Sequence, residues 1–330
     1  MLAGCTGGSG GPASAPPTSA STPVVTTTTV PAPAVVDPAS VRANELGEVP
    51  VLMYHRIEAV PPSEFDRTPA DFRAELQALY DGRYRPVRAS DLVSGHLDVP
   101  AGTTPVVLTF DDGSPSQFAH LPDGRVDPNT AVGILLDFAA THPGFNAVAT
   151  FYVNRNPFNA SDPKPLFQDL ARRGFEFGDH TLTHADLGKL DSARVQRELV
   201  QGLDLITTNL PGAAVTTMAL PYGSLPKDHA LALRGSWSGR PYSFSGAFLV
   251  GAAPSPSPFG TGFDPGAIPR IRSSAWDGKT ADYGSTFWLD QLARHPERRY
   301  ISDGDPAHIS FPTALRGRLA PRFAEQARPY

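Results

Sequence analysis

The feature that most constrains the fold is a short apolar run, residues 105–110 (PVVLTF), that ends in two adjacent carboxylates, Asp111 and Asp112. A continuous apolar run of this length, closed by Gly113, is typical of a strand buried on both faces, as in a parallel sheet. Functional groups of parallel sheets gather at the carboxyl ends of the strands. We therefore expect Asp111 and Asp112 to lie at a functional site.

Similar apolar runs alternate with segments of helical periodicity. The expected strands cover residues 49–54, 105–110, 147–153, 175–178, 216–220 and 243–250, with weaker candidates at 268–272 and 299–302. The expected helices begin at residue 69 and cover 130–141, 165–173 and 191–209. Strands and helices that alternate with short connections predict an α/β fold with a parallel sheet or (β/α) barrel.

Composition excludes several classes of protein. The chain has 330 residues, 40% of them hydrophobic, which is enough for one large domain or two modest ones. Its formal net charge is −5, so no overall positive charge favours nucleic acid, and we expect no nucleic-acid partner. The sequence contains no apolar stretch near the roughly 20 residues of a membrane-spanning helix.

Residues 1–45 are rich in Gly, Ser, Thr, Pro and Ala, and we expect a disordered tether there, with one catalytic domain over 46–330. Residues 2–5 (LAGC) resemble a bacterial lipobox, although only Met1 precedes them, so the natural start is expected upstream. A lipid on Cys5 would make the protein an extracellular, surface-anchored lipoprotein with no other membrane contact. The alternative is a free cysteine in a flexible tail.

Two imidazoles, His180 and His184, stand four residues apart after the expected strand at 175–178. With one carboxylate they form a ligand set for a single divalent metal, and zinc is the default for nitrogen and oxygen ligands. Iron, cobalt or nickel fit the same set. Neighbouring side chains diverge, so one of Asp111 and Asp112 would bind the metal and the other would face substrate. Alone, Asp-Asp-Gly is also typical of a tight turn.

Three segments together resemble the polysaccharide deacetylase family, also called the NodB homology domain or carbohydrate esterase family 4. They are residues 109–113 (TFDDG), 149–153 (ATFYV) and 180–184 (HTLTH). Residues 51–57 (VLMYHRI) and 219–223 (ALPYG) resemble the branch that acts on poly-β-1,6-N-acetylglucosamine. The resemblance implies a single domain with a distorted (β/α) barrel and metal-dependent hydrolysis of N-acetyl groups on sugars.

The resemblance also implies roles for individual residues. Asp111 would be the general base, and the metal ligands would be Asp112, His180 and His184. The backbone N–H of Tyr222 would stabilise the oxyanion. Substrate would contact Leu187, beside the acetyl methyl group, and Pro221, Tyr222 and, as a weaker candidate, Trp276.

The chain departs from the family pattern at two points. Ala219 occupies the position of an arginine that orients the base in many members, and Arg270 or Arg272 would replace it. The late Leu-x-His segment that supplies the usual catalytic acid is not evident in the sequence. His308 is a weak candidate for that acid, and His55, after the first expected strand, is another candidate for a site role.

The leading hypothesis is an extracellular, metal-dependent deacetylase, acting as a monomer on an N-acetylated polysaccharide of the cell surface. The glycan stays open between poly-N-acetylglucosamine, chitin and peptidoglycan. One alternative is an O-acetyl esterase or a non-sugar amidase on the same scaffold, and another is a degenerate sugar-binding protein. A polar loop over residues 117–129 is expected to shape access to the site.

Overall fold

The computed structural model describes residues 7–8, 11, 36–274 and 283–330. Residues 36–274 and 283–330 belong to one compact unit. This unit begins before the expected boundary at residue 46, because α1 (Pro38–Val41) is capped by Asp37 and the backbone of Asn44 pairs with that of Ile301. Cys5 lies outside the described residues.

The core of the fold is an eight-stranded parallel sheet with seven strands in the order β10-β1-β3-β4-β5-β6-β9 and β2 paired to β3. The strands are β1 (Val51–Tyr54), β2 (Tyr84–Val87), β3 (Thr104–Asp111), β4 (Thr150–Val153), β5 (Glu176–Asp179), β6 (Thr217–Ala219), β9 (Gly246–Phe248) and β10 (Ile271–Arg272). A bridge from Phe248 to Ile268 links the two edges of the sheet. The sheet therefore curls into the distorted (β/α) barrel that the sequence predicts.

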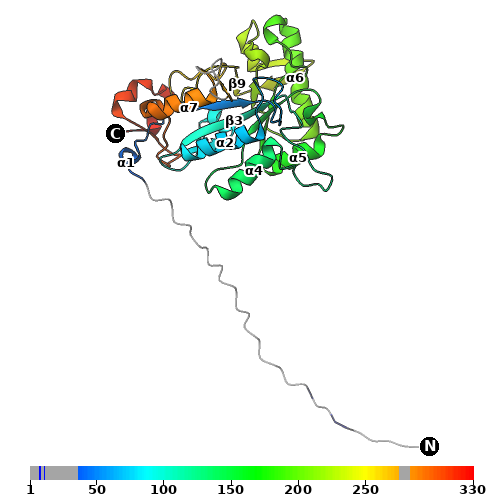
Figure 1. Ribbon diagram of the computed structural model, residues 1–330, viewed down its shortest axis with the longest axis horizontal. Coiled ribbons are helices and arrows are strands. Elements are labelled where there is room, and N and C mark those ends of the chain that lie inside the picture. Colours follow the sequence, from blue (N-terminus) through cyan, green and yellow to red (C-terminus); the bar gives the residue numbers. More distant parts are fainter. Residues whose placement is uncertain (1–6, 9–10, 12–35, 275–282) are drawn as a thin grey trace, which may run out of the picture. The chain divides into compact units, whose positions relative to one another are not determined.

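Helices cover the outside of this sheet (Figure 1). They are α2 (Pro69–Asp81), α4 (Ala131–Thr141), α5 (Lys164–Arg172), α6 (Ser192–Asn209) and α7 (Ser285–Arg294). The short helix α3 (Ala89–Ser94) instead packs Ala89 and Leu92 into the hydrophobic cluster on the inner face of the sheet. The side chains of Thr68, Thr130 and Asp191 accept backbone N–H groups at the starts of α2, α4 and α6. These caps explain why the helix starts follow from the sequence.

Several elements have no counterpart among the expected ones. They are β2, α3, α7, the antiparallel hairpin of β7 (Arg234–Trp237) and β8 (Arg240–Ser243), and the pair β11 (Ile309–Phe311) and β12 (Ala327–Pro329). Short 3-10 turns complete the chain: η1 (Pro157–Asn159), η2 (Leu187–Lys189), η3 (Pro221–Gly223), η4 (His229–Ala232), η5 (Pro296–Arg298), η6 (Thr313–Arg318) and η7 (Pro321–Gln326). Pro86 hides β2 from sequence reasoning, because proline is normally confined to strand edges. The expected strand at 299–302 forms only isolated bridges.

Both faces of the sheet are buried, and β3 shows how its residues divide between them. Val106, Leu108 and Phe110 belong to the cluster that the outer helices cover, whereas Val107 belongs to a second cluster on the other face. Successive strand residues point to opposite faces. Asp111 therefore shares the inner face with Val107 and Thr109, and this alternation directs its side chain into the barrel.

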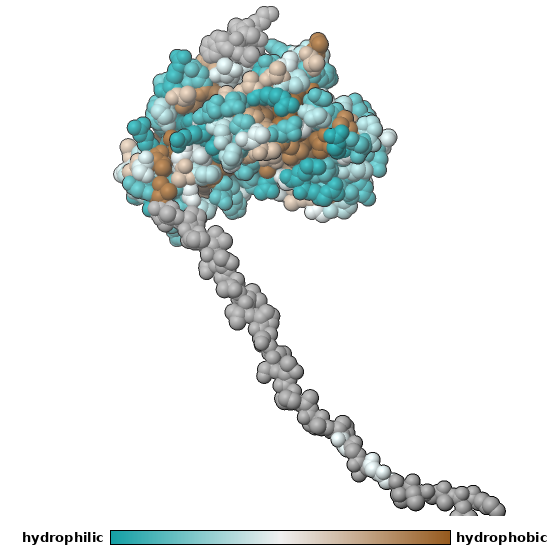
Figure 2. Space-filling model, turned by 60° about the horizontal axis from the view of Figure 1, so that its bottom comes forward, coloured by the Kyte–Doolittle hydropathy of each residue, from teal (hydrophilic) through white to brown (hydrophobic). Residues whose placement is uncertain are grey.

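Within the described residues, no helix is both long and apolar enough to cross a bilayer. The face drawn in Figure 2 is mostly hydrophilic, with narrow apolar bands between the polar regions.

A buried carboxyl, Glu45, joins the start of the compact unit to its C-terminal segment. Its oxygens accept the backbone N–H of Ser310 at 2.8 Å and the hydroxyls of Tyr300 and Ser302 at 3.2 Å. Burial is the largest influence and raises the pKa of Glu45 to about 8, with Asp303 adding to the rise and the Ser310 N–H opposing it. The folded protein therefore holds this carboxyl protonated at neutral pH.

This predicts a pH-dependent stability. Between the ordinary pKa of 4.5 and about 8, the folded state binds a proton at Glu45 that the unfolded state releases. The free energy of unfolding should therefore fall, by the order of a few kcal/mol, as pH rises through that range. Glu45→Gln mimics the protonated carboxyl and should remove that decline in chemical denaturation series. The exposed control Glu325→Gln should keep the decline. If the free energy of unfolding changed equally with pH in both variants, the decline would not come from Glu45.

Candidate metal centre and active site

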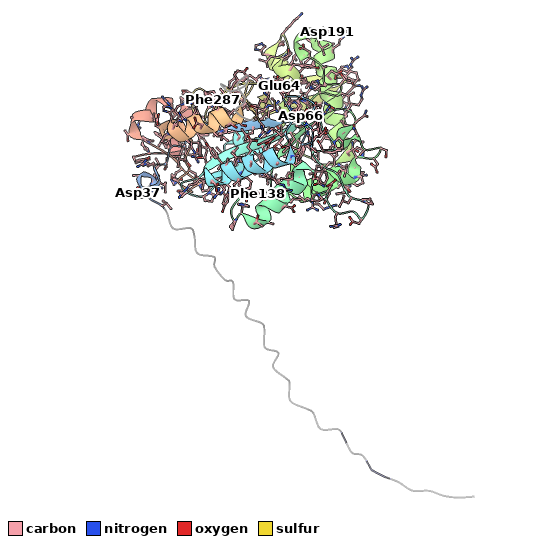
Figure 3. All side chains as sticks on the ribbon, viewed as in Figure 1. Asp37, Glu64, Asp66, Phe138, Asp191 and Phe287 are labelled. Atoms are coloured by element: carbon pink, nitrogen blue, oxygen red, sulfur yellow. The ribbon has the colours of Figure 1, made fainter. Side chains whose placement is uncertain are left out.

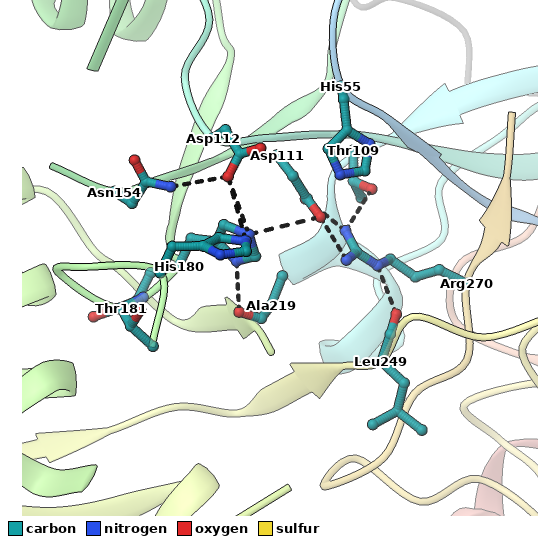
Figure 4. Close-up of polar contacts among 12 residues, drawn as sticks. His55, Thr109, Asp111, Asp112, Asn154, His180, Thr181, Ala219, Leu249 and Arg270 are labelled. Atoms are coloured by element: carbon teal, nitrogen blue, oxygen red, sulfur yellow. Dashed lines mark hydrogen bonds and ion pairs between the residues drawn. The ribbon is translucent and has the colours of Figure 1, made fainter. Parts of the chain in front are cut away.

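Three side chains from two strand ends meet at the open end of the barrel. Asp112 follows β3 and His180 follows β5 (Figure 4). His184 comes four residues after His180 in the same loop. The Asp112 Oδ1 atom lies 3.6 Å from His180 Nε2 and 3.5 Å from His184 Nε2, and the three atoms all lie within 4.8 Å of one another. For an ion held tetrahedrally at about 2.0–2.2 Å, ligand atoms lie about 3.3–3.6 Å apart. The triad therefore has the spacing of a mononuclear metal site.

The hydrogen bonds around the triad fit this role. The Nδ1 atom of His180 lies 2.8 Å from the carbonyl oxygen of Ala219, so Nδ1 carries the proton and the Nε2 lone pair faces Asp112. Burial, the largest influence, lowers the pKa of His180 and favours the neutral imidazole that a metal requires. Asn154 donates from Nδ2 to Asp112 Oδ1 at 2.9 Å and orients that carboxylate.

The loop between the two histidines is held by buried acids. Asp179 accepts the backbone N–H of Thr181 at 2.6 Å, and Glu198 on α6 accepts both the N–H and the hydroxyl of Thr183 at 2.9 Å. Positive φ angles accumulate around the site, with 59° at Thr181 and 57° at His184, and also 74° at Asp112 and 59° at Tyr222. Such backbone conformations are unfavourable for these residues and persist only where surrounding contacts impose them.

Arg270, which precedes β10, holds Asp111 beside the triad, with Asp111 Oδ2 at 3.9 Å from His180 Nε2. The guanidinium donates from Nη1 to Asp111 Oδ1 and from Nη2 to Oδ2, both at 2.7 Å, and also reaches Thr109 Oγ1 and the Leu249 carbonyl. Burial alone would raise the pKa of Asp111, but the charge of Arg270, helped by His180, holds it well below its usual range. Asp111 is therefore an ionised carboxylate at the floor of the site.

This pairing decides between the two arginines proposed from the sequence. Arg270 orients Asp111, whereas Arg272 pairs with Glu64 at 3.2 Å and lies over the Phe65 ring at 4.8 Å. Arg270 thus reaches Asp111 from the segment before β10, whereas Ala219 lies in β6.

His55, at the end of β1, faces the same centre. The backbone carbonyls of His55 and Asp111 both accept the Nε2 amide of buried Gln117, at 2.7 and 2.5 Å, which fixes the two residues relative to each other. Within the described part of the chain, His55 Nδ1 is buried without a hydrogen-bond partner. Burial is the largest influence and lowers the pKa of His55, while Asp111 and Asp112 oppose it.

Asp111, Asp112 and His55 line both of two adjoining cavities, and His180 and His184 line the first of them. One cavity, of about 640 Å³, has an apolar wall of Met53, Pro62, Phe65, Tyr222 and Val250. The other, of about 410 Å³, has polar walls. We call them the apolar lobe and the polar lobe of one cleft.

Phe65 belongs to a loop that follows β1 and carries Glu64 and Asp66, both labelled in Figure 3. Asp66 fixes the loop by accepting the backbone N–H of Arg56 at 3.1 Å and the hydroxyl of Ser63 at 2.6 Å. These hydrogen bonds therefore hold in place the loop that forms this part of the wall of the apolar lobe.

The structure places three of the substrate and acid candidates away from the cleft. Leu187 is fully buried in the hydrophobic core, Pro221 is also buried, and neither lines the cleft. His308 is half exposed, bonds to Asp305 at 2.7 Å and lines neither lobe. Trp276 lies outside the described residues.

Tyr222 does lie at the site. Its ring is exposed and meets the His184 ring edge-on at 4.7 Å. The backbone N–H groups of Gly223 and Ser224 donate to Leu220 and Pro221, whereas that of Tyr222 has no backbone acceptor among the described residues. This N–H is thus free to donate to a bound substrate.

Sequence reasoning missed Gln117, Asn154, Asp179 and Glu198. For Asn154 a signal existed, since it directly follows the strand at 150–153 just as Asp112 follows β3. Gln117 is the first residue of the loop over 117–129, which the sequence predicts to shape access to the site. Farther along this loop, His120 bonds to Asp169 on α5 at 2.9 Å. Glu198 lies within a helix, where its sequence spacing carries no sign of a role.

Comparison with known proteins agrees with this geometry. Residues 98–235 match the family model for polysaccharide deacetylase. The chain is 32% identical over 118 residues to a chitin deacetylase of Arthroderma benhamiae, covering 36% of this chain and 27% of that protein. It is 33% identical over 128 residues to a chitooligosaccharide deacetylase of Bradyrhizobium sp., covering 39% of this chain and 50% of that protein. The chain thus spans half or less of the length of these two relatives.

A solved structure is similar to this fold over a larger share of the chain. The deacetylase PplD of Streptococcus pyogenes superposes with a TM-score of 0.52 at 18% identity, covering 75% of this chain and 97% of the other. At this identity the likeness shows the fold, which is the expected barrel of the NodB homology type. The family model and the relatives support the polysaccharide deacetylase family for this chain. Asp111, the metal triad and Tyr222 lie within residues 98–235, whereas His55 and Arg270 lie outside them.

Proposed function

We propose that this chain, similar over residues 98–235 to polysaccharide deacetylases, hydrolyses N-acetyl groups of an N-acetylglucosamine-containing polysaccharide with one bound divalent metal. The observation that carries the proposal is the pairing of a metal triad with a separate, buried carboxylate. Asp112, His180 and His184 have metal-ligand spacing, and Arg270 holds Asp111 beside them as an ionised base. A protein that only binds sugar needs no such division between two adjacent carboxylates.

A metal bound to the triad would polarise the acetyl carbonyl and make water a better nucleophile at neutral pH. Asp111 accepts the proton of the attacking water, and Arg270 keeps its carboxylate ionised and aimed at the centre. The Tyr222 N–H donates to the oxygen of the acetyl group as negative charge develops there. Zinc is the metal that we propose, because two imidazoles and one carboxylate are ligands it commonly takes.

Release of the sugar amine requires a proton donor, and His55 takes this role in the proposal. It lines both lobes beside Asp111 and Asp112, and Gln117 ties its backbone to that of Asp111. Figure 4 shows His55 and His180 on different sides of the Asp111 carboxylate. A donor at His55 acts on the side of the centre away from the metal triad, and it replaces the rejected His308.

The apolar lobe suits a sugar ring. Phe65 and Tyr222 stand in its wall, and aromatic rings bind the apolar faces of sugars. We further propose that the substrate belongs to the glycans of the cell surface, which leaves poly-N-acetylglucosamine, chitin and peptidoglycan as candidates. A lipid anchor on Cys5, placing the enzyme at the outer cell surface, is part of the same proposal.

The function predicts metal-dependent acetate release. Purified protein supplied with zinc should release acetate from N-acetylglucosamine oligomers, and a chelator should stop the reaction until metal is restored. Asp112→Ala should lower kcat/KM at least about 100-fold, since a lost Lewis acid removes several kcal/mol of transition-state stabilisation. Release that survives both chelation and Asp112→Ala would refute the metal mechanism.

The His55 assignment separates amide from ester hydrolysis. His55→Gln should lower deacetylation of sugar amides by about 100-fold or more, the usual contribution of a general acid. Hydrolysis of an aryl acetate by the same variant should fall less than about tenfold, because its leaving group departs without a proton. His229→Gln, on exposed η4, is the matched control. Equal losses on both substrates would show that His55 is not the acid, and an enzyme that hydrolyses only esters would favour an O-acetyl esterase.

A further inference from the structure

The polar lobe of the cleft has no role in the reaction as described so far. It adjoins Asp111, Asp112 and His55, and its outer wall consists of Arg56, Glu58, Asn154, Arg155, Asn156 and Asn159. Its volume of about 410 Å³ is enough for a substituent of the glycan next to the acetyl group being removed. Its lining would therefore contact whatever the substrate carries at that position.

The free positive charges in the wall of this lobe outnumber the free negative ones. The side chains of Arg56 and Arg155 are exposed, and neither forms an ion pair, a side-chain hydrogen bond or a ring contact within the described residues. Most nearby carboxylates are engaged. Asp111 is paired with Arg270, and Asp112 belongs to the metal triad.

The remaining carboxylates of the rim do not change that balance. Glu64 pairs with Arg272, and Asp66 accepts the Arg56 backbone and Ser63. Glu58 is the one other acidic side chain in the wall of the polar lobe among the described residues. Two free guanidinium groups thus face one free carboxylate.

Arg155 is carried on a loop whose backbone is set by the metal site. Its N–H donates to the Leu182 carbonyl, between the two histidine ligands, at 2.8 Å. Phe158 is buried and its N–H donates to Gly113, directly after Asp112. The start of the Arg155 side chain is therefore fixed relative to the metal triad, as a positioned recognition group requires.

From these observations we propose that the polar lobe binds an anionic group, a carboxylate or a phosphate, on the glycan strand that is being deacetylated. Guanidinium groups are the side chains best suited to these planar or multidentate anions. The amides of Asn156 and Asn159 add neutral donors to the same wall. The substrate is then an acidic N-acetylated glycan rather than a neutral homopolymer, an inference that rests on the proposed function.

The test compares matched substrates. N-Acetylglucosamine oligomers would be assayed beside oligomers in which alternate residues carry a lactyl carboxylate and beside oligomers that carry a phosphate. Wild-type protein should show a kcat/KM at least about tenfold higher on one of the two anionic series, through a lower KM, and added salt should reduce the advantage. The series that is favoured identifies the anion.

Arg56→Gln combined with Arg155→Gln should reduce that preference at least about tenfold. Arg316→Gln, an exposed arginine that lines neither lobe, should retain it. Binding of the deacetylated anionic oligomers to the metal-loaded protein, measured by calorimetry, should weaken in the double variant alone. This binding does not depend on turnover.

The outcomes separate the two proposals. Acetate release from neutral oligomers without any anionic preference would overturn the role of the polar lobe and leave the proposed function standing. The role of the polar lobe would also be overturned if kcat/KM of the double variant fell equally on all three substrate series. If no oligomer releases acetate, the proposed function fails, and the calorimetric comparison still decides whether the two arginines bind the anion.

Discussion

The ion pair between Asp111 and Arg270 is the interaction on which the site depends. Both residues are almost fully buried, and two hydrogen bonds of 2.7 Å join them. A carboxylate at that depth would take up a proton without its partner, because burial disfavours the charged form. The guanidinium keeps it ionised and also fixes its direction. The adjacent Asp112 remains available to the metal triad, so two neighbouring carboxylates perform separate tasks.

The barrel makes this arrangement possible by bringing distant segments to one end of the sheet. His55 follows β1, Asp111 ends β3 and Asp112 follows it, Asn154 follows β4, and the two histidines follow β5. Alternation along β3 sends Asp111 inward with Thr109, while the left-handed backbone at Asp112 turns its side chain toward the histidines. The cost of such strained backbone is met by buried contacts, among them those of Glu198 and Gln117.

Much of this architecture could be predicted from the sequence because local signals specify it. Apolar runs and helix caps locate most strands and helices, and the position of Asp111, Asp112, His180 and His184 after strands predicts their convergence. Strand β2 was not predicted because it contains Pro86, and helix α7 was not predicted because no side chain caps its start.

Long-range partners carry no local signal. Both Arg270 and Arg272 fit the sequence equally well as partners of Asp111, and only the pairing of β10 with β1 decides between them. Likewise, nothing in the residues around His308 shows that it lies away from the cleft, or that His55 lies beside Asp111. These positions depend on how the sheet closes, which the spacing of residues along the chain does not reveal.

The most direct test of the account is to measure metal content and acetate release together in Arg270→Lys. Lysine keeps the charge but cannot hold both carboxylate oxygens. The account predicts one divalent ion per chain, as in the wild type, with kcat lowered by about 100-fold because the base is misplaced. Arg125→Lys, at the exposed pair with Asp123, is the control and should match the wild type. Undiminished acetate release, or loss of the metal from the variant, would contradict the separation of base from metal ligands.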